Sequence, residues 1–279
     1  ILDVAATNWS GWAIKRDGSL WGWGQQGYCN SDGTVRHWLS PQPMAGRFQK
    51  LYAGWARVYG IDSSGSLSRW RSNASICAME HLGNNFKNVF VGMWGTYALK
   101  SDDSLWGWGD EYSAGTGRQI ELKPQRILSG IKSVQIGSYY FVHALGYDGT
   151  IWGWGANSDG TVGDGTTLLA RTPQWVGTGF FDLLEGGYYS AAASHSDGSI
   201  WMWGWNRNQW FGDGFQEFVL SPTLVMQGKR FIQVATGDDT AIGLDSNGVV
   251  WTWGRSATGD GATFRRVTQP IAVMSAIAR

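Results

Sequence analysis

The chain has 279 residues, and its 22 Lys and Arg balance its 22 Asp and Glu, so the formal net charge at pH 7 is zero. Without a net field to attract a polyanion, the composition argues against nucleic acid and against an anionic membrane as partners. No apolar run approaches the roughly 20 residues that span a bilayer, so we expect no membrane insertion. The first residues lack the basic and apolar segments of a signal peptide, and we expect a mature or excised product.

A five-residue stretch with two tryptophans is repeated along the chain. Leu20-Trp21-Gly22-Trp23-Gly24 has near copies at 105–109 and 151–155, looser copies at 200–204 and 250–254, and a worn copy at 67–71 that keeps only the second Trp. The second Trp recurs after 38 residues at the shortest (Trp70 to Trp108) and 50 at the longest (Trp203 to Trp253). A period of about 40–50 residues is typical of propeller blades.

Within each repeat the segments follow one order. A short apolar strand ends in Gly, as in Leu51-Tyr52-Ala53-Gly54, and a second strand closes on Ala or Gly. A two-residue turn such as Asp17-Gly18 or Asn247-Gly248 then leads into the Trp strand, and this is the strongest short-range signal for a hairpin. A polar, Gly-rich loop and a returning strand complete the repeat. The returning strand usually carries Pro, which suits an outer edge strand.

These segments contain no helical period of any length, so the predicted fold class is all-β. We predict a six-bladed β-propeller whose blades are four-stranded antiparallel sheets. Eleven of the 19 tryptophans stand in the Trp-x-Trp positions, where we expect both rings to pack between blades as core. We predict a single domain over residues 1–279 with six repeats, at about 1–47, 48–85, 86–130, 131–178, 179–228 and 229–279.

The order of these motifs resembles that of the regulator-of-chromosome-condensation propeller family. Asn157-Ser158-Asp159-Gly160-Thr161-Val162-Gly163-Asp164-Gly165-Thr166 is the best match to that family's post-Trp loop, and the doubled Trp is similar in style to bacterial and phage-type members. The resemblance implies a closing blade that combines strands from both chain ends, here 1–7 and 270–278. The nuclear members are nucleotide-exchange factors that bind chromatin, but their inserted wedge and basic extensions are not seen in this sequence.

The loop after the first strand of each repeat carries the candidate binding residues. In the family this loop lies on one flat face around the axis, and in five of the six repeats here it holds a large aromatic residue. Such rings either form a protein-binding hot spot or pack over the axis opening and seal it. The family includes secreted bacterial β-lactamase inhibitors whose matching loops form the binding face, and this resemblance favours binding. The candidate binding residues are Trp9, Trp55, Arg57, Trp94, Tyr139, Tyr140, Tyr188, Tyr189 and Asp239.

Catalytic and metal sites have little support in the sequence. The four histidines show no metal-ligand spacing, and no Gly-x-Ser-x-Gly elbow is present. We interpret His143 as a hydrogen-bonded core residue. The recurring Asp164, Asp213 and Asp260 read as turn formers, because one Asp per blade supplies too few oxygens for Ca²⁺. We therefore predict that the protein is not an enzyme and needs no metal or cofactor.

The two cysteines leave an alternative open. Cys29 and Cys77 follow the second Trp of neighbouring repeats by six or seven residues, in what we expect to be matching loops. They form either a disulfide between the first two blades, which would indicate an oxidising compartment, or a pair of unrelated small residues.

Together these features predict a non-enzymatic protein that binds another macromolecule, a protein in the first instance, through the aromatic loop face. One alternative is a lectin-like module in which the same rings stack on carbohydrate. The other is a structural component of a larger assembly. We expect the protein to work outside the cell, on a cell surface or in a virion.

Overall fold

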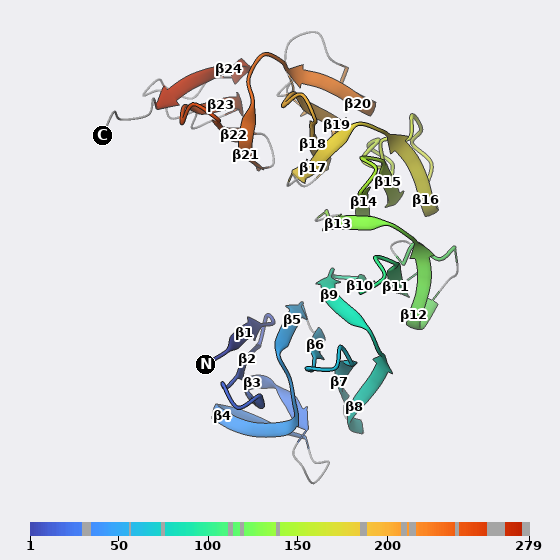
Figure 1. The fold of residues 1–279 in the computed structure, drawn as a ribbon, viewed down its shortest axis with the longest axis vertical. Helices are drawn as coiled ribbons and strands as arrows, with labels where there is room; N and C mark the ends of the chain where they lie inside the picture. Colours follow the sequence, from blue (N-terminus) through green and yellow to red (C-terminus); the bar gives the residue numbers. More distant parts are fainter. Residues whose placement is uncertain are drawn as a thin grey trace. The chain divides into compact units, whose positions relative to one another are not determined.

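Every repeat folds into a sheet of its own. The computed structural model of the chain describes residues 1–29, 35–55, 57–73, 76–110, 114–117, 120–137, 140–184, 189–207, 211, 216–237, 240–255 and 266–274. The described strands, β1 to β24, form six antiparallel four-stranded sheets, each made of four consecutive strands within one predicted repeat range (Figure 1). The chain divides into two compact units, Ile1–Asp110 with Ile120–Ser129, and Glu111–Gln119 with Gly130–Arg279.

The first unit holds three sheets. The first sheet is formed by β1 (Asp3–Ala6), β2 (Ser10–Ile14), β3 (Ser19–Cys29) and β4 (Val35–Arg47). The second is formed by β5 (Lys50–Gly54), β6 (Arg57–Ile61), β7 (Leu67–Asn73) and β8 (Ile76–Gly83). The third is formed by β9 (Phe86–Val91), β10 (Gly95–Lys100), β11 (Leu105–Asp110) and β12 (Ile120–Leu128).

The second unit holds the other three sheets. The fourth sheet is formed by β13 (Ile131–Ile136), β14 (Phe141–Gly146), β15 (Ile151–Gly155) and β16 (Ala170–Gly177). The fifth is formed by β17 (Phe180–Leu184), β18 (Ser190–His195), β19 (Ile200–Trp205) and β20 (Phe218–Met226). The sixth is formed by β21 (Phe231–Thr236), β22 (Thr240–Asp245), β23 (Val250–Arg255) and β24 (Arg266–Met274).

The terminal strands do not share a sheet. Among the described strands, β1 lies in the first sheet beside β2, and β24 lies in the last sheet beside β23. The expectation that one blade combines strands from both chain ends is therefore wrong for the described residues. Each terminal repeat supplies four strands of its own, so its backbone hydrogen bonds are satisfied within its own ladder.

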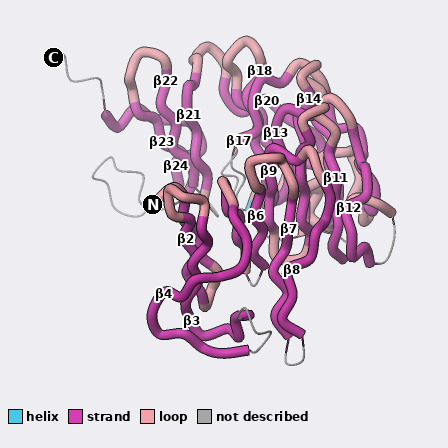
Figure 2. Tube along the Cα trace, turned by 60° about the horizontal axis from the view of Figure 1, so that its bottom comes forward, coloured by secondary structure: helices cyan, strands magenta, loops and turns pink. Residues whose placement is uncertain are grey.

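A short turn joins the second strand to the third in each sheet (Figure 2). In the five repeats that have it, the first Trp of the motif lies near the start of the third strand. In the first sheet the Asp17 carboxylate accepts hydrogen bonds from the Ser19 amide at 3.0 Å and the Ser19 hydroxyl at 2.7 Å, and the Ser19 hydroxyl accepts one from Trp21 Nε1 at 3.2 Å. The hydrogen bond from the Ser19 side chain is the largest cause that lowers the pKa of the Asp17 carboxyl. The same series of hydrogen bonds, from Trp to Ser and from Ser to Asp, occurs in two other sheets. The residues are Asp102, Ser104 and Trp106 in one and Asp197, Ser199 and Trp201 in the other.

The second Trp of the motif lies at the centre of the core. In four repeats it is at most 2% exposed: Trp108, Trp154, Trp203 and Trp253. Trp108 of β11 donates its Nε1–H to the Tyr59 hydroxyl of β6 at 3.3 Å, so it connects the third sheet to the second. Trp203 of β19 donates to the Thr161 carbonyl of the fourth repeat at 3.0 Å. These two rings join neighbouring sheets. The equivalent Trp23 and Trp70 of the first two repeats are half-buried.

The first Trp of the motif is less buried than the sequence predicts. Trp21 is half-buried, and the Lys15 ammonium lies 3.5 Å from the centre of its ring. The reason is its position, two residues nearer the hairpin turn than the second Trp and so roughly 7 Å further along the strand. There a lysine ammonium lies over the face of the ring in a cation–π contact, in place of an apolar side chain. The same pairing occurs between Lys100 and Trp106 and between Lys229 and Trp251.

Both cysteines lie on strands and not in the loops that the sequence predicts. Cys29 ends β3, and Cys77 lies within β8. The loop prediction fails because β3 runs on past Trp23 to Cys29 and because the returning strand β8 already begins at Ile76. The disulfide between Cys29 and Cys77 falls outside the described side chains and stays a prediction.

Candidate functional site

The loops between the first and second strands differ in length, and this sets where their aromatic residues stand. In the third repeat three residues, 92–94, connect β9 to β10, whereas in the second only 55–56 connect β5 to β6. Trp9 and Trp94 therefore stand immediately before the second strand of their sheets, and Trp55 stands one residue earlier, at the tip of a tight hairpin. All three belong to the first unit.

These three residues form a continuous line of indoles, which we call the tryptophan row: Trp9, Trp55 and Trp94. The ring centroids of Trp9 and Trp55 lie 6.0 Å apart, and those of Trp55 and Trp94 lie 6.2 Å apart. Successive rings are tilted by 41° and 53°. Trp9 is 41% exposed and Trp55 is 43% exposed, whereas Trp94 is half-buried beside Met93, which is 46% exposed. The row thus combines mutual ring contact with open indole surface.

Backbone hydrogen bonds hold the loops that carry the row. The Asn8 amide donates to the Trp55 carbonyl at 3.1 Å, which ties the first loop to the second. The Thr7 amide donates to the Ser10 carbonyl at 2.9 Å, and the Gly92 amide donates to the Gly95 carbonyl at 2.9 Å. Because the backbone is fixed in this way, the rings are presented with little loop entropy left to lose on binding.

The final Gly of the tryptophan motif lies directly under these aromatic loops. Gly155 has a φ of 107°, and a Cβ there would lie 2.0 Å from the Tyr140 carbonyl oxygen. A residue with a side chain is excluded by both the backbone conformation and the contact. Gly109 meets the Trp94 carbonyl and Gly204 meets the Tyr189 carbonyl in the same way, at 2.4 and 2.5 Å. This link between the repeated motif and the candidate site is invisible in the sequence, because it depends on two adjacent strands.

Arg57 stands two residues after Trp55, as the first residue of β6. Its side chain is half-buried, and its Nη1 is buried without a hydrogen-bond partner among the described residues. Another arginine of the same sheet is paired, because Arg69 Nη2 lies 2.6 Å from Glu80 Oε2. Arg57 therefore carries a positive charge two residues from Trp55 that no described carboxylate matches.

The remaining described candidates lie in the second unit. Tyr140 is half-buried with a φ of 60°, a conformation uncommon for a bulky residue, and its carbonyl accepts a hydrogen bond from the Ala156 amide at 2.9 Å. Tyr189 is half-buried, and its ring meets that of Trp205 edge-on with the ring centroids 5.2 Å apart. The predicted site residues Tyr139, Tyr188 and Asp239 lie outside the described residues.

His143 is a core residue, as the sequence predicts. It is 2% exposed, its Nε2 lies 3.2 Å from the Val162 carbonyl, and burial lowers its pKa from 6.5 to about 4. The neutral ring donates its Nε2–H to that carbonyl, which leaves the Thr161 carbonyl to Trp203. A ring without access to solvent cannot take a proton from a substrate.

The buried His143 predicts a loss of stability in mild acid. The unfolded chain binds the proton near pH 6.5 and the folded chain only near pH 4, so the contribution is complete above pH 6.5 and is lost as the pH falls towards 4. We expect the free energy of unfolding to fall by about 2 kcal/mol from pH 7 to pH 5 through this group. Urea unfolding at both values measures it.

His143→Gln should remove most of that dependence, because the amide keeps a donor for the Val162 carbonyl but does not titrate. His81→Gln is the matched control, since His81 is exposed and hydrogen-bonded to the Ser66 hydroxyl at 3.0 Å. An unchanged pH dependence in the His143→Gln variant would contradict this account.

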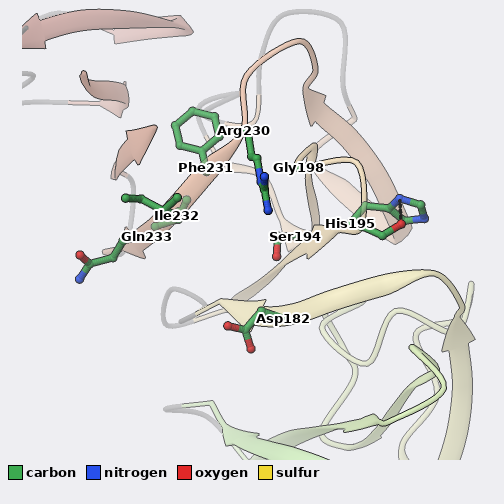
Figure 3. Close-up of a pocket in the computed structure, with 10 residues that line it drawn as sticks. Asp182, Ser194, His195, Gly198, Arg230, Phe231, Ile232 and Gln233 are labelled. Atoms are coloured by element: carbon green, nitrogen blue, oxygen red, sulfur yellow. Dashed lines mark hydrogen bonds between the residues drawn. The ribbon is translucent and has the colours of Figure 1, made fainter. Parts of the chain in front are cut away.

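A pocket of about 230 Å³ in the second unit collects polar residues but does not assemble a catalytic group. Its lining includes Asp182, Ser194, His195 and Arg230. Figure 3 shows the His195 ring directed away from Ser194, and Asp182 directed away from both. Ser194 and His195 are successive residues of β18, whose side chains point to opposite faces of the sheet. This geometry gives no Ser–His–Asp arrangement of Ser194, His195 and Asp182.

The described acidic and histidine side chains do not gather into a metal site. Over that part of the chain no three His, Cys, Asp or Glu residues lie together as metal ligands. Asp164 is a turn former, as predicted, because its Oδ1 accepts hydrogen bonds from the Thr166 amide at 3.0 Å and the Thr166 hydroxyl at 2.8 Å. Asp213 and Asp260 lie outside the described residues. Nor do the described elements include a helix of the length and hydropathy that crossing a bilayer requires.

Models of one repeat family match the chain. The Regulator of chromosome condensation (RCC1) repeat matches over residues 197–244, and a second model of the same repeat matches over residues 231–259. No curated protein sequence matches the chain significantly.

Several solved structures share its fold. Prp20p from Saccharomyces cerevisiae, studied with its binding to Gsp1p and histones, is 18% identical with a TM-score of 0.65, over 98% of this chain and 76% of Prp20p. Yeast RCC1 (Prp20), solved bound to Kap60, is 18% identical with a TM-score of 0.64, over 98% of this chain and 74% of the matched chain. Human WBSCR16 is 14% identical with a TM-score of 0.65, over 98% of this chain and 81% of WBSCR16. At these identities the likeness concerns the fold.

Proposed function

We propose that the chain is a six-bladed, non-enzymatic propeller of the RCC1-repeat type that binds another protein through the tryptophan row. The observation that carries this proposal is the row itself, with ring centroids 6.0 and 6.2 Å apart and two rings more than 40% exposed. Tryptophan is enriched in binding hot spots, and contiguous exposed apolar surface on a soluble protein marks an interaction site.

The exposed indole surface is large enough to matter energetically. A Trp side chain buries up to about 250 Å², so covering the exposed two-fifths of Trp9 and of Trp55 removes roughly 200 Å² from water. At about 25 cal/mol per Å² this contributes roughly 5 kcal/mol. Together with polar contacts at the rim, such a gain offsets the entropy that association costs.

The geometry favours a protein over a carbohydrate. Sugars stack on the flat face of a ring, whereas the rings of the row turn by 41° and then 53° and offer no common plane. Tilted rings leave angled spaces that suit inserted side chains. The propellers of similar fold also support this choice, since Prp20p was studied with Gsp1p and histones and was solved with Kap60. An extracellular, cell-surface or virion location stays a prediction.

Selection of random peptides displayed on phage against the immobilised full chain tests the proposal, with a glycan array run in parallel. We expect selected peptides to bind the wild type and to bind Trp55→Ala at least roughly 30-fold more weakly, the effect of losing a hot-spot residue. The matched control is Trp175→Ala, an indole of β16 in the second unit that is 58% exposed, and it should bind within about twofold of the wild type.

Two results would count against the proposal. Peptide binding that survives Trp55→Ala, with the variant folded by circular dichroism, would show that the row is not the binding surface. Glycan binding that Trp55→Ala abolishes would favour the lectin-like alternative.

A further inference from the structure

Arg57 indicates the chemistry of the partner, an inference that rests on the proposed function. It begins β6, two residues from Trp55, and its side chain makes no hydrogen bond or ion pair with a described residue. Its Nη1 is nevertheless buried. The guanidinium is charged at every physiological pH and carries five N–H donors, so a buried donor without an acceptor is an energetic liability.

The neighbouring Arg69 differs from Arg57 in having an ion-pair partner, although its Nε is also buried without a hydrogen-bond partner among the described residues. Arg69 of β7 lies 2.6 Å from the Glu80 carboxylate of β8, the residue opposite it in the ladder. The described part of the first unit gives Arg57 no such carboxylate. The difference is expected if the acceptor for Arg57 comes from a bound partner.

A carboxylate fits this position better than a phosphate polymer does. The planar guanidinium matches a carboxylate in a two-pronged hydrogen bond, and indoles that exclude water around it strengthen the attraction between the charges. Binding to a polyanion needs several cations along a track, whereas this chain has zero net charge and Arg57 is the described cation nearest to Trp55 in the sequence. One guanidinium two residues from an exposed indole calls for one carboxylate within an apolar segment.

We propose that the tryptophan row and Arg57 bind a protein segment in which one Asp or Glu side chain lies next to a large apolar side chain. The carboxylate accepts hydrogen bonds from the Arg57 guanidinium. The apolar side chain covers the exposed face of Trp55 and shields the ion pair from water. The rings provide the contact area, and Arg57 provides the selectivity.

A double-mutant cycle with peptides selected on the full chain tests this proposal. We expect the selected sequences to share an acidic residue beside an aromatic or large aliphatic one. Changing that acid to its amide in a synthetic peptide should weaken binding to the wild type by at least roughly 30-fold, as when one partner of a buried charge pair is removed. Arg57→Gln should weaken binding of the acidic peptide by the same factor. The Arg57→Gln variant should then bind the acidic peptide and the amide peptide with equal affinity.

Arg16→Gln is the matched control, because Arg16 is an exposed arginine of the same unit, and its affinities should equal those of the wild type. Selected peptides without an acidic residue, or an acid-to-amide effect of equal size in the wild type and in Arg57→Gln, would overturn the carboxylate pairing. If Trp55→Ala still abolished binding, the proposed function would stand. Stronger binding of a phosphoserine version, lost in Arg57→Gln, would assign the site to phosphate instead.

Discussion

Replacing Trp203 with alanine is expected to lower the free energy of unfolding by about 3–5 kcal/mol, the range for a buried Trp→Ala change. The ring is fully buried and meets His143 of β14 edge-on, with centroids 5.2 Å apart. Its Nε1–H donates to the Thr161 carbonyl at 3.0 Å. Alanine would leave a cavity between the fourth and fifth sheets and a buried acceptor without its donor, so packing and hydrogen bonding are lost together.

Urea unfolding followed by far-UV circular dichroism measures this change. Trp175→Ala is again the control, because the same side chain is removed from a site that is 58% exposed, and the expected change is within about 0.5 kcal/mol. If the two variants unfolded at similar urea concentrations, the claim that the second Trp of the motif joins neighbouring sheets would be wrong.

Gly155→Ala is expected to destabilise the fold by at least about 3 kcal/mol, although it adds a single methyl group. The residue has a φ of 107°, and the added Cβ would lie 2.0 Å from the backbone oxygen of Tyr140, which cannot rotate away as a side chain can. Relief requires the Tyr140 loop to move, so this substitution also changes how an aromatic residue of the loop face is presented.

Gly130→Ala separates the contact from the backbone strain. Gly130 also has a positive φ, of 68°, but a Cβ there meets nothing within 4 Å. We expect it to cost about 1–2 kcal/mol, the ordinary penalty of a left-handed conformation. Thermal unfolding of the two variants side by side gives the comparison. Equal losses would mean that the Tyr140 carbonyl does not constrain Gly155.

The sheets and their hairpins could be predicted from the sequence because their signals are local. Asp17-Gly18 and its counterparts each identify one turn from two adjacent residues, and Trp-x-Trp identifies the strand that follows. The aromatic residues of the loops could also be predicted from the sequence, because a ring in a turn does not fit the alternation of either neighbouring strand. These residues are Trp9, Trp55 and Trp94. Because the motif is repeated along the chain, each repeat supports the same prediction of strands and turns independently.

Other features depend on neighbours that the sequence does not reveal. The unequal burial of Trp21 and the second Trp comes from their distance to the turn and from the lysine that covers the outer ring. The pairing of β1 and β24 within their own sheets depends on which ladder the terminal strands join. The lack of a described acceptor for Arg57 Nη1 depends on where the side chains of the neighbouring strands lie.

The account as a whole holds that the second Trp of the motif is core while Trp9 and Trp55 of the tryptophan row are exposed to solvent. Limited oxidation by N-bromosuccinimide, with peptide mass mapping of each indole, tests this most directly. Trp9 and Trp55, which are 41% and 43% exposed, should react early, and the four buried rings of the motif should react last. Oxidation of Trp108, Trp154, Trp203 or Trp253 ahead of Trp9 and Trp55 would contradict the account.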